Sequence, residues 1–306
     1  MKYKENNEQK RLLIFKENQA KTDIYTVEAR SLLNRATGFM DAYDFTLNPY
    51  RGCHYGCSYC YAAAFSPDKQ KRQNWGNWIV IKNNAVSVLE KELARWHKKH
   101  DRPPKIYMSS VTDPYQPIER QQQLTRQLLS VMLAYQPVLV VQTRSPMIVR
   151  DLDLLQQFEY LRINLSIPTG SEAVKRDFEP KSPSIKSRLQ TINKLKYNLA
   201  SNNLHRIGFS VTITPLLPTF LKDRERFFRQ LVTVDRIVIQ DFHPTRNSSL
   251  IASTRKEAIA LKQKYAWWYD NEPESYRQFK QSLQDCITAW SSDTEILEGK
   301  LGFGYD

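Results

Sequence analysis

Residues 48–61 read Asn48-Pro49-Tyr50-Arg51-Gly52-Cys53-His54-Tyr55-Gly56-Cys57-Ser58-Tyr59-Cys60-Tyr61, and they hold three of the four cysteines of a 306-residue chain. The spacing is Cys-x3-Cys-x2-Cys, which allows three thiolates to reach one inorganic centre. Thiolate is the form in which cysteine binds zinc and iron-sulfur clusters. Two glycines within the stretch suit a loop that turns tightly, because glycine tolerates unusual backbone angles.

Three clustered thiolates favour an iron-sulfur cluster over other cysteine sites. Structural zinc normally takes four ligands, often as two cysteine pairs, and the sequence has no second pair. A zinc site completed by His54 or a remote histidine is an alternative. A redox pair of Cys57 and Cys60 is another, but it gives Cys53 no role. A cluster of four irons uses all three thiolates and leaves one iron open for chemistry.

The cysteine spacing, with Tyr59 directly before the third cysteine, resembles the signature of the radical S-adenosylmethionine (SAM) superfamily. The resemblance implies a [4Fe-4S] cluster bound by Cys53, Cys57 and Cys60, with SAM chelated to the open iron. Such clusters reach potentials of about −700 mV, low enough to reduce a sulfonium. In the family, SAM is split to a 5′-deoxyadenosyl radical that takes a hydrogen atom from the substrate. The protein supplies position and excludes water.

Composition indicates a reducing compartment and no membrane span. Four cysteines, three of them clustered, do not make a disulfide framework, so we expect a cytoplasmic protein. The first residues, Met1-Lys2-Tyr3-Lys4-Glu5, lack the apolar segment of a secretory signal. The sequence also has no apolar run of about 18 residues, the length that a transmembrane helix needs.

The chain is strongly basic, with a formal net charge of +13 and a pI near 9.5. This charge suggests an anionic partner, and nucleic acid is the first candidate. Residues 69–105 hold ten Lys or Arg against three acids, and Trp75 and Trp78 lie in this run. One interpretation is a surface for phosphate contact and base stacking. The other, with equal weight, is a solvated basic face whose tryptophans pack in the core.

Strand-like and helix-like patterns alternate along the chain. Strands are expected at 44–48, 105–111, 137–143, 161–167, 206–214 and 236–240. Helical spacing of apolar residues falls between them. This alternation predicts parallel strands with crossover helices, in an open sheet or a barrel. The resemblance favours an α/β fold with a partial (β/α)6 TIM-like barrel. We expect an N-terminal extension at 1–44, the radical SAM core at 45–245 and a C-terminal helical cap at 246–306.

Polar residues follow nearly every predicted strand, at the edge where barrel enzymes gather their chemistry. The segment Thr112-Asp113-Pro114-Tyr115-Gln116-Pro117-Ile118-Glu119 follows the second strand, and Glu179-Pro180 with a later Arg188-Leu189 follows the fourth. Together with the Asn-Pro-Tyr-x-Gly-Cys start of the cysteine stretch and Thr143-Arg144-Ser145, these motifs resemble the spore photoproduct lyase branch. For Glu179 and Arg188, a structural ion pair is the alternative to a role in the site.

The resemblance assigns cofactor contacts to six residues. Tyr59 would lie against the adenine of SAM, and Arg144 would meet its carboxylate. Ser166 would reach the carboxylate or the ribose. The amino group of SAM would be received in the region of Ser109, Ser110 and Thr112.

The chain departs from this branch at two points. The histidine often found two residues before the second cysteine is replaced by Tyr55, and the neighbouring His54 is given no role. The lyase also uses a cysteine near the end of the second strand as hydrogen donor, where this chain has Ser109 and Ser110. An O–H bond is too strong to replace a thiol, so thymine-dimer reversal is not expected. Cys286 reads as a small core residue of a C-terminal helix, while His243 is a pocket candidate.

The sequence therefore predicts an enzyme that cleaves SAM reductively and begins radical chemistry on an unidentified substrate. Nucleic acid or a nucleotide is the leading substrate class, and flavodoxin or ferredoxin is the expected reducing partner. Two alternatives stay open. One is a non-catalytic zinc or iron-sulfur protein that binds nucleic acid, and the other is a radical SAM enzyme that acts on a peptide or a metabolite.

Overall fold

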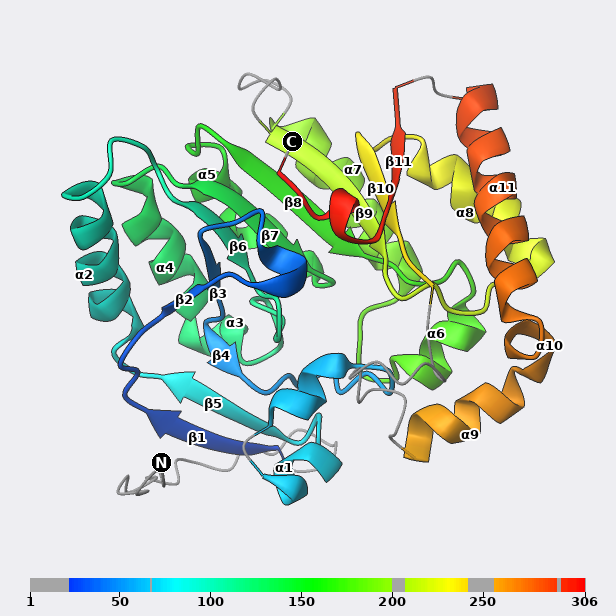
Figure 1. Ribbon diagram of the computed structural model, residues 1–306, viewed down its shortest axis with the longest axis horizontal. Helices are drawn as coiled ribbons and strands as arrows, with labels where there is room; N and C mark the ends of the chain where they lie inside the picture. Colours follow the sequence, from blue (N-terminus) through cyan, green and yellow to red (C-terminus); the bar gives the residue numbers. More distant parts are fainter. Residues whose placement is uncertain (1–21, 67, 200–206, 242–255, 291–292, 306) are drawn as a thin grey trace.

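The computed structural model describes residues 22–66, 68–199, 207–241, 256–290 and 293–305. A curved eight-stranded sheet forms the centre of this part of the chain (Figure 1), in the order β11-β10-β9-β8-β7-β6-β3-β2. The strands are β2 (Leu33–Arg35), β3 (Phe45–Leu47), β6 (Lys105–Met108), β7 (Val138–Thr143), β8 (Leu161–Ser166), β9 (Ile207–Ile213), β10 (Arg236–Ile239) and β11 (Glu295–Glu298).

All six predicted strands are confirmed, and they pair in the parallel direction. The sheet has two further strands at its edges. β2 is antiparallel to β3, and β11 is parallel to β10. Because β2 and β11 are the two ends of the strand order, the sheet is an open, partial barrel.

Helices cover the outer face of the curved sheet (Figure 1). They are α2 (Ala85–His97), α4 (Leu124–Leu133), α5 (Leu152–Leu155), α7 (Ile185–Leu199) and α8 (Leu221–Leu231), while the short helices α3 (Glu119–Gln122) and α6 (Glu172–Phe178) lie at the lower edge of the sheet in Figure 1. Their buried aliphatic residues, such as Leu89 and Leu128, join Val141 and Ile163 of the sheet in one core. This burial of apolar surface is the main stabilising term of the fold.

A second, three-stranded sheet has the order β1-β5-β4 and was not predicted. It is formed by β1 (Asp23–Val27), β4 (Tyr50–Arg51) and β5 (Trp78–Lys82). Trp75 and Trp78 are 5% and 3% exposed, with ring centroids 5.8 Å apart. The base-stacking interpretation of these tryptophans is therefore wrong, because their rings pack in the core. β4 leads directly into the cysteine loop, so this sheet anchors it.

The C-terminal segment contains the expected helices, α9 (Lys256–Lys264), α10 (Ala266–Tyr269) and α11 (Glu272–Trp290). Cys286 lies on α11, half-buried, and packs against the main core as predicted. The segment also supplies β11 and a short helix, α12 (Gly299–Gly302). The proposed boundaries near residues 44 and 245 stay predictions. Among the helices described, none has the length and apolar character required to cross a membrane.

Candidate active site

The cysteine loop follows β3 and β4 at the carboxyl edge of the main sheet. Cys53 and Cys57 are buried, Cys60 is partly exposed, and none of the three forms a disulfide. The backbone of Gly52 has a φ of +80°, and a Cβ there would lie 2.5 Å from the carbonyl oxygen of Trp78. Glycine is thus required at Gly52 both for the left-handed conformation and for the close approach.

The three thiols lie close enough to influence one another electrostatically. Burial raises the pKa of Cys53 well above its usual range, and the charges of Asp113, Cys57 and Cys60 raise it further. Among the described residues, no group of three or more Cys, His, Asp or Glu side chains is placed to hold a single metal ion.

The segment after β6 holds the cysteine loop through hydrogen bonds. The hydroxyl of Thr112 donates to the carbonyl oxygen of Gly52 at 2.6 Å. Gln116 is fully buried, and its side-chain oxygen accepts from the backbone N–H of His54 at 2.8 Å, while its amide N–H donates to Gly52. These contacts fix the loop on both sides of Cys53, in a part of the protein where unpaired polar groups would be costly.

Two acidic residues of the same segment are buried and saturated with partners. Asp113 accepts from the Thr143 hydroxyl at 2.7 Å and from the backbone N–H of Arg144 at 2.9 Å, which ties the segment to the end of β7. Burial raises the pKa of Asp113, and the N–H and charge of Arg144 offset part of this rise. Glu119, fully buried, accepts from the Tyr50 hydroxyl and pairs with Arg150 at 2.7 Å.

Arg144 lies at the centre of a buried charge cluster beside the cysteines. Its Nη1 donates to the sulfur of Cys57 at 2.8 Å and to the Tyr59 hydroxyl at 3.1 Å, and it pairs with Glu179. The other carboxylate oxygen of Glu179 pairs with Arg188, so the predicted ion pair is confirmed. Burial alone would raise the pKa of Glu179, but Arg188 and Arg144 outweigh it and lower the pKa to about 2.

The serines named from the sequence lie at the same edge of the sheet. Ser109 is 2% exposed with a φ of +76°, and its hydroxyl has no hydrogen-bond partner among the described residues. The Ser110 hydroxyl accepts from the side-chain amide of Asn48 at 3.3 Å. Ser166 ends β8 and is buried, and its carbonyl oxygen accepts from Arg188 at 2.9 Å. Their contacts with SAM stay predictions, as do those of Tyr59, Thr112 and Arg144.

The residues that hold the cysteine loop in place were given no individual role from the sequence. They are Tyr50, Asp113, Gln116 and Glu119, and membership in the motifs at 48–61 and 112–119 is the sequence signal that marks them. The ring of His54 lies 3.2 Å from the Thr22 hydroxyl, and its backbone N–H donates to the side-chain oxygen of Gln116. His243 lies outside the described residues.

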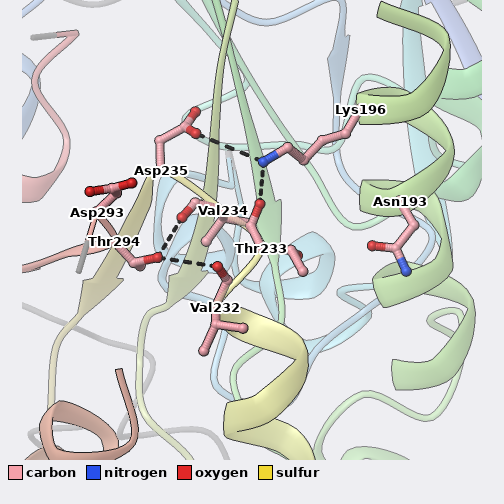
Figure 2. A pocket seen from close by; sticks show the side chains of 8 residues that line it. All are labelled: Asn193, Lys196, Val232, Thr233, Val234, Asp235, Asp293 and Thr294. Carbon is pink, nitrogen blue, oxygen red and sulfur yellow. Dashed lines mark hydrogen bonds and ion pairs between the residues drawn. The ribbon is translucent and has the colours of Figure 1, made fainter. Parts of the chain in front are cut away.

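A pocket of about 550 Å³ occurs away from this edge (Figure 2). It lies where the chain enters β10 and β11, between Asp235, Thr294 and Lys196 of α7. Lys196 donates to the carbonyl oxygen of Thr233, and the Thr294 hydroxyl donates to that of Val234 at 2.8 Å. These bonds serve the connections between elements, and none of the predicted site residues lines the pocket.

Comparison with known proteins identifies the fold and its chemistry. Residues 47–231 match the Radical SAM superfamily. The chain belongs to this superfamily. Radical SAM enzymes carry a [4Fe-4S] cluster and use SAM, and the protein is accordingly a radical SAM enzyme with these two cofactors. The predicted family, fold class and cofactors are confirmed.

Two relatives of this radical SAM chain are described as uncharacterised proteins. A protein of Methanocaldococcus jannaschii is 31% identical over 202 residues, which cover 66% of this chain and 71% of the relative. A protein of Mycobacterium tuberculosis is 27% identical over 181 residues, which cover 57% of this chain and half of that protein.

Among solved structures, a cysteine-to-alanine mutant of spore photoproduct lyase with dinucleoside spore photoproduct has a TM-score of 0.60 at 15% identity. The match covers 89% of this chain and 81% of that one. A further mutant of the same lyase with bound SAM and dinucleoside gives a TM-score of 0.58. At this level of identity the similarity shows a shared fold.

Proposed function

We propose that Cys53, Cys57 and Cys60 bind three irons of the [4Fe-4S] cluster and that SAM occupies the open iron. The observation that carries the proposal is the grouping of three cysteines in one loop at the carboxyl edge of the sheet. Bound there, the two cofactors would supply the radical chemistry that takes a hydrogen atom from the substrate.

The residues around the thiols have distinct tasks in this proposal. Tyr59 and Arg144 flank Cys57 and offer a ring and a positive charge to SAM. Glu179 orients Arg144 through their ion pair and keeps a buried guanidinium charge balanced. Ser109, Ser110, Thr112 and Ser166 supply polar groups along the same edge. The hydrogen bonds from Thr112 and Gln116 hold the loop in shape before cofactors bind.

The substrate in this proposal is nucleic acid or a nucleotide. The net charge of +13 favours an anionic partner, and the fold is shared with a lyase whose structures hold a dinucleoside. Ser109 and Ser110 supply no thiol, so the reaction differs from one that ends on a cysteine hydrogen donor. Electrons would come from a flavodoxin or ferredoxin in the cytoplasm.

Anaerobic purification tests the proposal directly. We expect a brown protein with four irons that forms 5′-deoxyadenosine from SAM after reduction. Cys57→Ala should lose both the colour and the product, whereas Cys286→Ala, a half-buried cysteine on α11, should keep both. A colourless protein with one zinc would instead support the non-catalytic nucleic-acid-binding alternative.

A further inference from the structure

A guanidinium group touches one of the three cysteines proposed to bind the cluster. Nη1 of Arg144 donates to the sulfur of Cys57 at 2.8 Å, and only 17% of the Arg144 side chain is exposed. Arginine keeps its positive charge in proteins. A full charge is therefore in direct contact with a proposed sulfur ligand, in a part of the protein that is largely shielded from water.

Arg144 is held in this position at both ends. Its backbone N–H donates to Asp113 at 2.9 Å, which fixes the residue at the carboxyl end of β7. At the other end, Nη1 pairs with Glu179, whose carboxylate also accepts from the Tyr59 hydroxyl. The guanidinium group does not depend on the sulfur for its position, so its contact with Cys57 follows from the surrounding structure.

Glu179 is itself fixed from the side away from Arg144. Its second carboxylate oxygen pairs with the fully buried Arg188 and accepts from the Ser182 hydroxyl at 3.1 Å. Arg188 also donates to the carbonyl oxygen of Ser166 at 2.9 Å. Two guanidinium groups and one carboxylate thus connect Cys57 to the end of β8.

A positive charge beside a sulfur ligand affects how easily an iron-sulfur cluster is reduced. Net charge and hydrogen bonds to the sulfurs are among the factors that set the potential. Reduction adds one electron, and both an N–H donor at the sulfur and a nearby positive charge stabilise the more negative form. The effect is large in a buried site, because the effective dielectric constant there is well below that of water.

Arg144 can contact Cys57 and meet SAM at the same time. Nη1 makes the contacts with Cys57, Tyr59 and Glu179, whereas Nη2 has no hydrogen bond to any residue that the structure describes. The two terminal nitrogens of a guanidinium group form a fork. One of them can stay on the sulfur while the other receives the carboxylate of SAM.

We propose that Arg144 sets the reduction potential of the [4Fe-4S] cluster through its contact with Cys57, and that it makes the cluster easier to reduce. The inference deepens the proposed function and rests on it, since it takes Cys57 as a ligand of the cluster. Glu179 is a positioning residue for Arg144, and its negative charge offsets part of the effect.

The potential of the cluster in the absence of SAM tests this inference. The full chain would be reconstituted anaerobically with iron and sulfide and titrated with dithionite, with the reduced cluster measured by electron paramagnetic resonance. Arg144→Gln removes the charge but keeps an N–H group for Glu179. We expect it to lower the ratio of reduced to oxidised cluster at a given potential at least tenfold, a shift of about 59 mV for a one-electron couple.

Arg236→Gln is the matched control. It also removes a buried guanidinium group, 4% exposed, but at the amino end of β10, on the edge of the sheet opposite the cysteine loop. The potential of this variant should equal that of the wild type.

Glu179→Gln should shift the potential with the opposite sign. It removes the carboxylate that offsets Arg144, so the potential should rise, whereas a mere loss of order around Cys57 would move both variants in the same direction. The sign of this shift decides the question if Arg144→Gln takes up no cluster. The inference is overturned if Glu179→Gln does not raise the potential, or if Arg144→Gln with its cluster bound does not lower it.

These results are distinct from a failure of the proposed function. A wild type that takes up no iron would refute the proposed function. A wild type that takes up four irons, with a potential that does not respond to the charge at Arg144, would refute this inference alone.

Discussion

Replacement of Glu179 by glutamine should destabilise the protein more than almost any other change of one charge. The carboxylate and Arg188 are both fully buried, and Arg144 pairs with the second carboxylate oxygen. The substitution leaves Arg188 without its carboxylate partner and leaves Arg144 with Asp113 alone, 4.0 Å away. Breaking a buried ion pair on one side costs about 3–5 kcal/mol.

The pKa of Glu179 gives an independent figure for the same interaction. It falls from an ordinary 4.5 to about 2, and each unit is worth about 1.4 kcal/mol, which gives roughly 3 kcal/mol. Because the folded pKa is lowered, this stability is fully present above pH 4.5 and is lost as pH falls toward 2. The difference between wild type and Glu179→Gln should therefore shrink between pH 5 and pH 3.

Urea unfolding followed by tryptophan fluorescence measures both effects. Glu225→Gln is the matched control, because Glu225 pairs with Arg229 at 2.5 Å on the exposed face of α8, and such pairs are worth about 0.3–0.5 kcal/mol. If Glu179→Gln loses no more stability than Glu225→Gln at pH 7, or if its deficit does not depend on pH, the charge cluster does not stabilise the fold as argued.

Three further predictions concern the cysteine loop and its surroundings. Gly52→Ala should lower the free energy of unfolding, measured by thermal denaturation, by more than about 2 kcal/mol, because it adds backbone strain and a steric clash. Gly38→Ala is the control, since Gly38 also has a positive φ but lies in open space, and it should cost about 1 kcal/mol. Gln116→Ala should reduce the iron content after anaerobic reconstitution, because the His54 N–H and the Gly52 carbonyl oxygen lose a buried partner, whereas Gln127→Ala at an exposed position should not. Equal iron content in the two variants would contradict the role of Gln116 in holding the cysteine loop. Burial and the charge of Arg51 lower the pKa of Lys82 to about 8, so between pH 8 and pH 10 the unfolded chain binds this proton more tightly than the folded protein, and the stability of the wild type should rise with pH. Lys82→Met should abolish the rise in urea unfolding, and a rise of equal size in the variant would refute the argument.

The main sheet could be predicted from the sequence because each of its six strands carries its own signal. The run at 137–143 is apolar throughout, and helical spacing follows each strand, so local patterns and the parallel topology agree. β1 and β5 pair across more than 50 residues, and β4 has only two residues. No local sequence pattern indicates such pairings. The apolar run of β5 therefore gave no strand prediction, because it lies next to Trp75 and among basic residues.

The cysteine loop could be found from spacing alone, whereas its supporting contacts could not. The expected contact of Thr112 with SAM stays a prediction, but the hydrogen bond from its hydroxyl to Gly52 could not be foreseen. Gln116 and Glu119 contact Gly52 and Tyr50, more than 60 residues earlier in the chain. Partners so distant in sequence become visible only when β3 and β6 lie side by side. A motif can therefore flag a residue as important without stating whether it meets the cofactor or holds the loop.

The bonds from Thr112 and Gln116 to the loop bear on how the enzyme recovers from oxygen. If the cluster were lost to oxygen, rebuilding it would require the three cysteines to stand in the same loop conformation. Here the loop around Cys53 is pinned by its own neighbours at Gly52 and His54. An enzyme that has lost its cluster should thus keep the conformation of the cysteine loop and take up new iron and sulfide without a slow refolding step.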